Sequence, residues 1–351
     1  MHPFSKKITN WYQQNKRDLP WRNTKDAYLI WLSEIILQQT RVDQGMAYYL
    51  KFAQEFPTVK HLAKAENEKV MKLWQGLGYY SRARNLHTTA KIITDNYKGK
   101  FPDQYNDILL LKGVGEYTAA AIASFAFNQP YAVVDGNVYR VLSRVFGIET
   151  PIDSSQGKKE FYSLANELID KKNPATHNQA IMEFGAIQCK PVSPDCSICP
   201  LNTMCFAYSK KRVSELPVKE KKIKVRDRYF NYIVLNHKTS TALNKRTEKD
   251  IWTNLYDFPL IETNVELNEE QFLRSQEWKS FIATTKYTVK LVSASYKHVL
   301  SHQKIYARFW EIDCKESFNK LLSKTCITIK KEDIHKYAVP RLIENYIEKT
   351  V

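Results

Sequence analysis

The sequence predicts a mainly α-helical N-terminal domain followed by a separate α+β domain, and three observations lead to that prediction. Apolar residues recur at helical spacing in four segments of the first part of the chain, which are 27–39, 68–77, 117–127 and 137–146. A basic stretch follows them. Beyond it, segments rich in aromatic and β-branched residues are typical of strands, at 229–235, 287–292 and 304–310. A chain of 351 residues is long enough for two domains, because a single core rarely grows beyond roughly 250–300 residues.

A change in composition predicts the boundary between the two domains. Residues 210–228 hold nine Lys or Arg against three Asp or Glu, with Pro217 among them. Such a segment is typical of a solvated linker, and a segment that lies against a phosphate backbone is the alternative. We therefore expect a helical domain at 1–209, a basic linker at 210–227 and a C-terminal domain at 228–351.

Composition and charge favour a globular protein that binds a polyanion. The 43% of hydrophobic and 13% of aromatic residues fit a globular chain rather than a disordered one. The formal net charge of +16 makes nucleic acid the leading candidate partner. Residues 1–7 are too polar for a secretory signal, and no apolar run approaches the roughly 20 residues that cross a bilayer. We expect a cytoplasmic protein without a membrane anchor.

Four of the six cysteines are crowded into the segment 189–205. Disulfides are rare in a reducing compartment, so this spacing indicates a metal centre instead. Zinc and a [4Fe–4S] cluster are the two alternatives for four thiolates. Zinc modules usually contain two close cysteine pairs, whereas this segment contains one, which favours iron–sulfur. The expected ligands are Cys189, Cys196, Cys199 and Cys205.

Two further features indicate a site that acts on a phosphate-linked substrate. Gly113-Val114-Gly115 permits a tight helical hairpin, and the helix that begins near Tyr117 then points free backbone N–H groups at its N-terminus, which suits a phosphate. Asp135 precedes the next predicted helix. An aspartate there normally caps the helix, but the helix N-terminus also keeps a carboxylate ionised, as stabilisation of a cationic sugar requires.

Glu34 is a carboxyl group in an otherwise apolar helix. Its neighbours on the same helical face are Ile30, Trp31 and Leu37, so we expect it to be partly desolvated, which favours the protonated form. A glutamate at the exposed edge of the helix is the alternative. One neutral and one ionised carboxyl group, here Glu34 and Asp135, are the pair that cleavage of a glycosidic bond needs.

The hairpin, the aspartate and the four-cysteine loop together resemble the helix–hairpin–helix DNA glycosylase superfamily, in its iron–sulfur branch, from about Trp11 to Phe206. The strings at 19–22, 31–40 and 76–86 are similar to the MutY family of adenine DNA glycosylases. The resemblance implies that Glu34 protonates adenine N7 and that Asp135, supported by Asn137, stabilises the oxocarbenium ion. Tyr117 stands where lyase-type relatives carry a lysine, which implies a monofunctional enzyme.

The same resemblance implies the residues that bind DNA. Those expected to line the pocket of the flipped adenine are Trp21, Arg22 and Gln179. Those expected to contact the opposite base or the duplex are Gln39, Thr40, Leu77, Tyr79, Gly113, Val114 and Gly115. Three positions depart from the family pattern: Lys112 replaces a frequent proline, Glu116 a frequent basic residue, and Tyr139 a lysine of some members.

The C-terminal part is similar to the Nudix-like domain of this family. Segment 251–259 resembles its tryptophan-containing motif, but the glutamate-rich Nudix box is absent from the sequence, so we expect no pyrophosphohydrolase activity. Ser301 and His302 match the loop that recognises 8-oxoguanine, whereas Leu300 replaces the phenylalanine of the family.

The expected function is therefore hydrolysis of the N-glycosidic bond of adenine mispaired with 8-oxoguanine or guanine in double-stranded DNA, by a monomeric enzyme that carries a [4Fe–4S] cluster. A thymine-mismatch glycosylase and an endonuclease III-like lyase are the alternatives within the superfamily. A cluster-bearing protein that binds DNA without catalysis is the alternative from another class.

Overall fold

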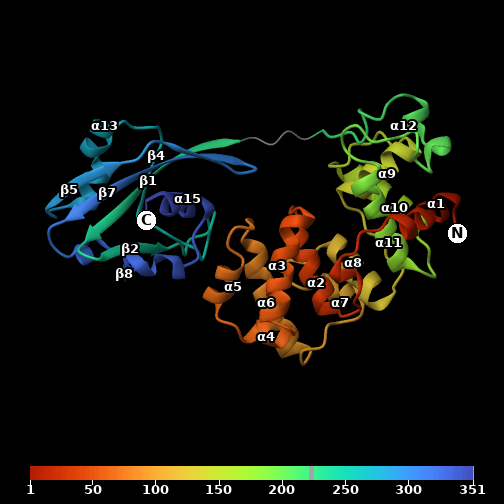
Figure 1. Ribbon diagram of the computed structural model, residues 1–351, viewed down its shortest axis with the longest axis horizontal. Coiled ribbons are helices and arrows are strands. Elements are labelled where there is room, and N and C mark those ends of the chain that lie inside the picture. The colour runs from red at the N-terminus through yellow and green to blue at the C-terminus, as the bar shows by residue number, and fades with distance from the viewer. Residues whose placement is uncertain (221–224, 351) are drawn as a thin grey trace. The chain divides into compact units, whose positions relative to one another are not determined.

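The computed structural model describes residues 1–220 and 225–350, which fall into two compact units (Figure 1). One unit comprises Met1–Lys64 and Asn85–Lys221, and the other Ala65–Arg84 and Lys222–Val351. Of the linker predicted at 210–227, residues 221–224 lie outside the described residues.

The first unit is built from helices, as the sequence predicts. The four predicted helical segments are present as α2, α5, α8 and α9, with α5 belonging to the second unit. The helices of the first unit are α1 (Pro3–Asn15), η1 (Pro20–Arg22), α2 (Ala27–Leu37), α3 (Val42–Glu55), α4 (Val59–Lys64), the larger part of α6 (Ser81–Asn96), α7 (Tyr105–Leu109), α8 (Glu116–Phe127), α9 (Gly136–Phe146), α10 (Ser155–Leu168), α11 (Pro174–Glu183), η2 (Phe184–Gln188), η3 (Asn202–Met204) and α12 (Phe206–Ser209).

The core of the first unit lies between α1, α8, α9, α10 and α11. Phe4, Leu142 and Phe161 are fully buried in it. Helix α8 presents Ala120 and Ala121 to this core, and it packs against α2 on another side. Small side chains let these helices approach closely, and each large buried side chain contributes roughly 1.5–3 kcal/mol. This packing holds α2, α8, α9 and α11 around one region of the unit.

The second unit is an α+β structure organised by a mixed sheet. Its strands are β1 (Arg226–His237), β2 (Ser240–Lys245), β3 (Tyr256–Asp257), β4 (Leu260–Thr263), β5 (Tyr287–Val292), β6 (Tyr296–Val299), β7 (Gln303–Cys314) and β8 (Cys326–Lys330). The order is β3-β2-β1-β7-β5, with β4 paired to β1, β6 to β7 and β8 to β2. The central strands β1 and β7 run parallel, from Arg226 opposite Gln303 to Asn236 opposite Asp313. The other helices are α5 (Asn67–Leu73), α13 (Glu269–Arg274), α14 (Gln276–Ile282), η4 (Phe318–Leu321), η5 (Lys331–Lys336) and α15 (Arg341–Thr350).

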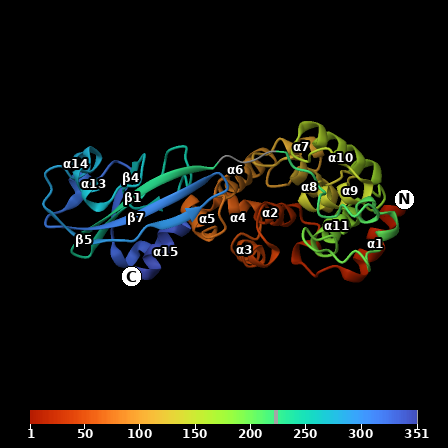
Figure 2. The ribbon, with the colours of Figure 1, turned by 90° about the horizontal axis from the view of Figure 1, so that it is seen from above.

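Helices cover both faces of this sheet (Figure 2). Trp310 of β7 stacks on Phe272 of α13, with ring centroids 4.2 Å apart. The adjacent Phe309 stacks on Tyr346 of α15 at 3.8 Å. Because successive side chains of a strand point to opposite faces, α13 and α15 lie on opposite sides of the sheet. Two aromatic layers therefore stabilise the strands that carry the loops described below.

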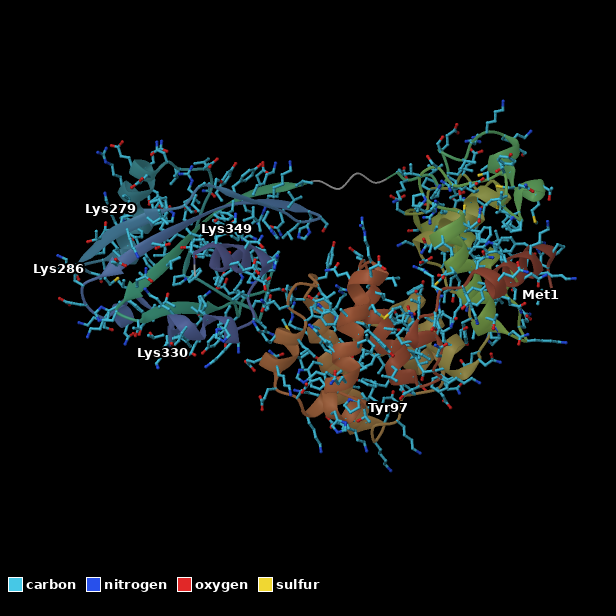
Figure 3. All side chains as sticks on the ribbon, in the orientation of Figure 1. Met1, Tyr97, Lys279, Lys286, Lys330 and Lys349 are labelled. Carbon is cyan, nitrogen blue, oxygen red and sulfur yellow. The ribbon has the colours of Figure 1, made fainter. Side chains whose placement is uncertain are left out.

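The surface carries much of the positive charge. Lys279, Lys286, Lys330 and Lys349 project from the second unit into solvent (Figure 3). They belong to the surplus of basic residues that gives the chain its formal net charge of +16. Within residues 1–220 and 225–350, no helix has both the length and the apolar character to span a membrane.

Candidate active site

Glu34 is buried in α2, with 8% of its surface exposed. Its Oε2 accepts a hydrogen bond of 2.8 Å from the Tyr117 hydroxyl of α8. Burial raises the pKa of Glu34 to about 7; the Tyr117 hydrogen bond and the Arg22 charge lower it, and the Asp135 charge raises it. The carboxyl group that the apolar neighbours predicted to be desolvated is therefore half-protonated close to neutral pH.

Asp135 caps the N-terminus of α9 and faces the same cavity. Its Oδ1 accepts hydrogen bonds from the backbone N–H groups of Asn137 and Val138, at 2.9 and 2.8 Å. Its Oδ2 accepts from Asn137 Nδ2 at 2.9 Å. Burial raises the pKa of Asp135 above its ordinary value, and these donors and the nearby Arg140 charge offset only part of that rise. Asp135 can therefore cap the helix and be stabilised as a carboxylate at once, because the same N–H donors do both.

A chain of hydrogen bonds extends from Asp135 to the cysteine loop. Asn137 Oδ1 accepts from Arg140 Nη2 at 2.8 Å, and Arg140 Nε donates to the carbonyl oxygen of Cys189 at 2.8 Å. Arg140 Nη2 also donates to the carbonyl oxygen of Gly185 at 2.6 Å. The Asn137 amide is therefore held from both ends, one at Asp135 and one at Arg140.

The predicted adenine-pocket residues converge on one cavity of about 200 Å³. Its lining includes Trp21, Arg22, Glu34, Thr40, Tyr117, Asp135, Asn137 and Gln179. A second cavity, of about 600 Å³, also reaches Glu34, Tyr117 and Asp135, and Gln39 and Gly115 line it. The structure thus brings Glu34, Asp135 and the expected base-binding residues together, from elements that are far apart in the sequence.

Three residues beside this cavity were not predicted, namely Tyr12, Arg17 and Glu183. Glu183 accepts hydrogen bonds from both Arg17 and Arg22 in the wall of the small cavity. Tyr12 donates to Gln179 Oε1 at 2.6 Å. The spacing of four residues between Gln179 and Glu183 places them on one face of α11, a signal that was available in the sequence.

The hairpin between α7 and α8 requires a glycine at position 113. Gly113 has φ +80°, and a Cβ there would come within 2.7 Å of the Asn85 side chain. Gly115 occupies the N-cap of α8, so the first N–H groups of that helix face outward beside it. Val114 is buried and anchors the turn. Lys112 is exposed, with its carbonyl oxygen bound by Thr89.

Two of the segments expected to contact the opposite base or the duplex, Leu77 with Tyr79 and Leu300 with Ser301 and His302, lie in the second unit. Gly76 and Gly78, both with positive φ, lie on either side of Leu77 in a turn, and Tyr79 follows Gly78 directly. The Leu77 side chain is buried, whereas Tyr79 is 48% exposed. A cavity of about 600 Å³ is lined by both of these residues and by the tip of the β6–β7 hairpin, which includes Leu300, Ser301 and His302.

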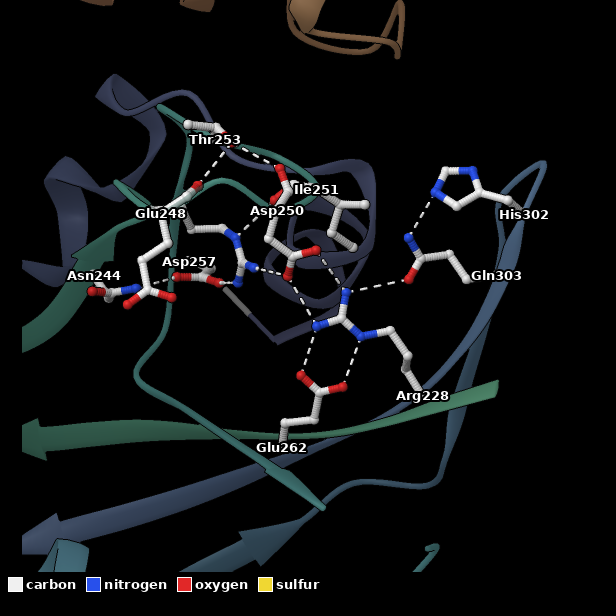
Figure 4. Close-up of polar contacts among 11 residues, drawn as sticks. Arg228, Asn244, Glu248, Asp250, Ile251, Thr253, Asp257, Glu262, His302 and Gln303 are labelled. Atoms are coloured by element: carbon white, nitrogen blue, oxygen red, sulfur yellow. Dashed lines mark hydrogen bonds and ion pairs between the residues drawn. The ribbon is translucent and has the colours of Figure 1, made fainter. Parts of the chain in front are cut away.

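An ion-pair network supports this hairpin tip (Figure 4). Arg228 Nη1 donates to Gln303 Oε1 at 3.2 Å, and Gln303 Nε2 lies 2.9 Å from His302 Nε2. Because an amide nitrogen only donates, His302 Nε2 is the acceptor, which leaves Nδ1 to carry the ring proton towards Ser301 Oγ, 3.2 Å away. Arg228 is itself fixed by Asp250 and Glu262.

The four cysteines of segment 189–205 are free, and burial raises the pKa of Cys196, Cys199 and Cys205. The pKa of Cys199 is raised to about 11 by burial and by the charges of Cys189, Cys205 and Cys196, although a backbone hydrogen bond lowers it. Arg144 Nη1 lies 3.4 Å from Cys189 Sγ. Among the described residues, no group of three or more His, Cys, Asp or Glu side chains is arranged to hold a single metal ion. The [4Fe–4S] cluster that the spacing of these cysteines indicates therefore stays a prediction.

Two family models match successive parts of the chain. A family model described as HhH-GPD superfamily base excision DNA repair protein matches residues 32–169. A NUDIX domain model matches residues 231–349.

Two solved structures resemble the helical part. A thermostable thymine-DNA glycosylase has 32% sequence identity and a TM-score of 0.55, over 59% of this chain and 95% of its own. An endonuclease III–DNA covalent complex, at 22% identity and a TM-score of 0.52, shares the fold over 59% of this chain and 94% of its own.

Three of the similar proteins carry one name, and the first two match most of this chain. The adenine DNA glycosylase of Buchnera aphidicola subsp. Acyrthosiphon pisum is 37% identical over 85% of this chain and 83% of its own length. That of Buchnera aphidicola subsp. Schizaphis graminum is 32% identical over 99% of both. The human adenine DNA glycosylase is 43% identical over 61% of this chain and 41% of its own. The chain therefore belongs to the adenine DNA glycosylase family, with a helix–hairpin–helix domain followed by a Nudix domain.

Proposed function

We propose that Glu34 and Asp135 are the catalytic pair of this enzyme, a base excision repair glycosylase that hydrolyses the N-glycosidic bond of adenine. The substrate is adenine mispaired with 8-oxoguanine or guanine in double-stranded DNA. One observation carries the assignment: a buried carboxyl group with a pKa of about 7 shares a cavity with a carboxylate that three N–H groups bind.

Each carboxyl group has a distinct task. Protonated Glu34 donates to N7 of the flipped adenine, which turns the base into a neutral leaving group. Asp135 stays ionised and stabilises the positive charge that develops on the sugar, with Asn137 holding it in place. After the base departs, the Glu34 carboxylate orients the attacking water. Tyr117 offers no amine for a Schiff base, which supports hydrolysis without strand cleavage.

The remaining predicted residues divide between the two bases of the mispair. In the small cavity, Trp21, Arg22 and Gln179 bind the flipped adenine, and extrusion of the base is what makes such a cavity accessible. Gln39 and Thr40 contact the base left opposite. In the second unit, Leu77 and Tyr79 enter the duplex, and Leu300, Ser301 and His302 contact the oxidised guanine. The α8 N-terminus behind Gly113, Val114 and Gly115 binds a backbone phosphate.

Cys189, Cys196, Cys199 and Cys205 would hold a [4Fe–4S] cluster. When bound, the cluster supplies cross-links that order its loop and leaves the adenine chemistry to Glu34 and Asp135. We further propose that the enzyme works as a monomer in the cytoplasm, on double-stranded DNA.

The substrate assignment is tested by measuring base release from four matched duplexes: adenine opposite 8-oxoguanine, opposite guanine and opposite thymine, and thymine opposite guanine. We expect adenine release from the first two duplexes only, with backbone cleavage only after added alkali. Thymine release would identify a thymine-mismatch glycosylase instead. The helical part is 32% identical to a thymine-DNA glycosylase, so the fourth duplex tests this alternative directly. A borohydride-trapped adduct would identify a lyase.

Replacing the acid tests the catalytic pair. Glu34→Gln keeps the shape of the side chain but removes the transferable proton, so we expect excision to fall by about 10²- to 10⁴-fold while duplex binding persists. The exposed Glu167→Gln, on α10, is the matched control and should excise at the parent rate. Retained excision by Glu34→Gln would remove Glu34 from the acid role.

Tyr117→Phe tests the environment of that acid. The Tyr117 hydrogen bond lowers the pKa of Glu34, so its loss raises that pKa and extends the protonated form to higher pH. Because the rate falls as pH rises through the Glu34 pKa of about 7, the ratio of single-turnover rates at about pH 8.5 and 6.5 should rise roughly three- to tenfold. An unchanged ratio would show that Tyr117 does not tune Glu34.

Cys199→Ala tests the cluster. We expect loss of bound iron, a lower thermal midpoint and weaker DNA binding, because the loop loses its cross-links. Cys326→Ser, which changes a thiol outside the segment 189–205, should keep the iron and the activity. An iron-free variant that binds and cuts DNA normally would contradict the structural role.

A further inference from the structure

Glu183 is a fully buried carboxylate at the C-terminal end of α11, in the wall of the cavity that holds Glu34. Its Oε1 accepts from the backbone N–H of Arg17 at 2.9 Å, from Arg17 Nε at 2.9 Å and from Arg22 Nη1 at 3.1 Å. Its Oε2 accepts from Arg17 Nη2 at 2.6 Å and from Arg22 Nη2 at 2.8 Å. The carboxylate is thus bound by two guanidinium groups at once.

This pairing keeps Glu183 ionised despite its burial. Burial raises the pKa of Glu183, but the hydrogen bonds from Arg17 and Arg22 and the Arg22 charge lower it to about 2. The buried carboxylate is therefore ionised near neutral pH. In turn it fixes Arg22, which also donates to the Arg17 carbonyl oxygen at 3.0 Å.

Arg22 acts on Glu34 as well. Both side chains line the same cavity, and the Arg22 charge favours the ionised form of Glu34. The other groups that face this region are the Tyr117 hydroxyl from α8, Asp135 from the start of α9, the Tyr12 hydroxyl from α1, Arg17 and Glu183. Without Glu183, two uncompensated guanidinium groups would lie near a carboxyl group that must stay protonated in order to act.

We propose that Glu183 is a positioning residue for excision: it fixes the Arg22 guanidinium in the cavity wall and offsets the positive charge there, so that Glu34 can still donate its proton near neutral pH. The inference rests on the proposed function, in which Glu34 is the acid. The alternative is a purely structural role, in which Glu183 only links α11 to the segment 17–22. In that case, loss of Glu183 should lower the stability of the enzyme and leave the pH dependence of excision unchanged.

The test is the pH profile of single-turnover adenine excision, with enzyme in excess over a duplex that carries adenine opposite 8-oxoguanine. Glu183→Gln keeps the size of the side chain and removes its charge. The Glu34 pKa should then fall, so the alkaline limb of the profile should move to lower pH. From a parent pKa of about 7, a fall of about one unit should lower the ratio of the rates at about pH 8 and pH 6 roughly fivefold below the ratio of the parent enzyme, because the protonated fraction falls tenfold per pH unit beyond the pKa.

Two comparisons separate charge from shape. Glu183→Asp retains the charge and should keep the limb close to the parent position, even where its maximal rate is lower. Glu149→Gln, which breaks the exposed ion pair with Arg212, should leave the whole profile unchanged. An even loss of rate at every pH in Glu183→Gln, with the limb in place, would overturn the proposal and leave Glu183 with the purely structural role.

Arg17→Gln keeps the proposal testable where Glu183→Gln does not fold. Arg17 is partly exposed, and its loss leaves Glu183 to offset Arg22 alone, so the limb should move to higher pH. A limb that stays in place or moves to lower pH would overturn the proposal. Parent enzyme that releases no adenine, or a Glu34→Gln variant that still does, would instead refute the proposed function itself.

Discussion

The burial of two carboxyl groups against one small cavity is the constraint on which the rest of the helical unit depends. A carboxyl group removed from water is costly unless it is protonated or bound by donors, and the unit uses both solutions. Glu34 is surrounded by apolar side chains of α2 and stays available in its protonated form. Asp135 receives the first N–H groups of α9 and the Asn137 amide. Asp135 thus accepts three N–H hydrogen bonds, whereas Glu34 accepts one from the Tyr117 hydroxyl.

Much of this could be predicted from the sequence, because its signals are local. Helical periodicity placed helices at 27–39, 117–127 and 137–146, where α2, α8 and α9 lie, with ends that differ by no more than two residues. The apolar neighbours of Glu34 predicted its burial, and the position of Asp135 before a helix predicted its cap. These inferences need only the geometry of one helix, which a short segment of sequence specifies.

The partners that complete each site could not be predicted, because they join residues far apart in the chain. Glu183 and Arg17 are separated by 166 positions, and Gln303 and Arg228 by 75. No periodicity relates such residues; the packing of α11 against α1 and the parallel pairing of β1 with β7 bring them together. Nor did the sequence indicate that the turn at Leu77 and Tyr79 shares a compact unit with the hairpin tip at Ser301.

The cysteine segment matters to the catalytic site for a mechanical reason. Arg140 donates to Asn137 on one side and to the carbonyl oxygens of Gly185 and Cys189 on the other. A guanidinium group is rigid and planar, so its position is set by whichever acceptors are best ordered. Order in the segment around Cys189 therefore fixes Arg140, Arg140 fixes the Asn137 amide, and that amide orients Asp135. A metal centre held by the cysteines would therefore influence the orientation of Asp135 through this chain of contacts.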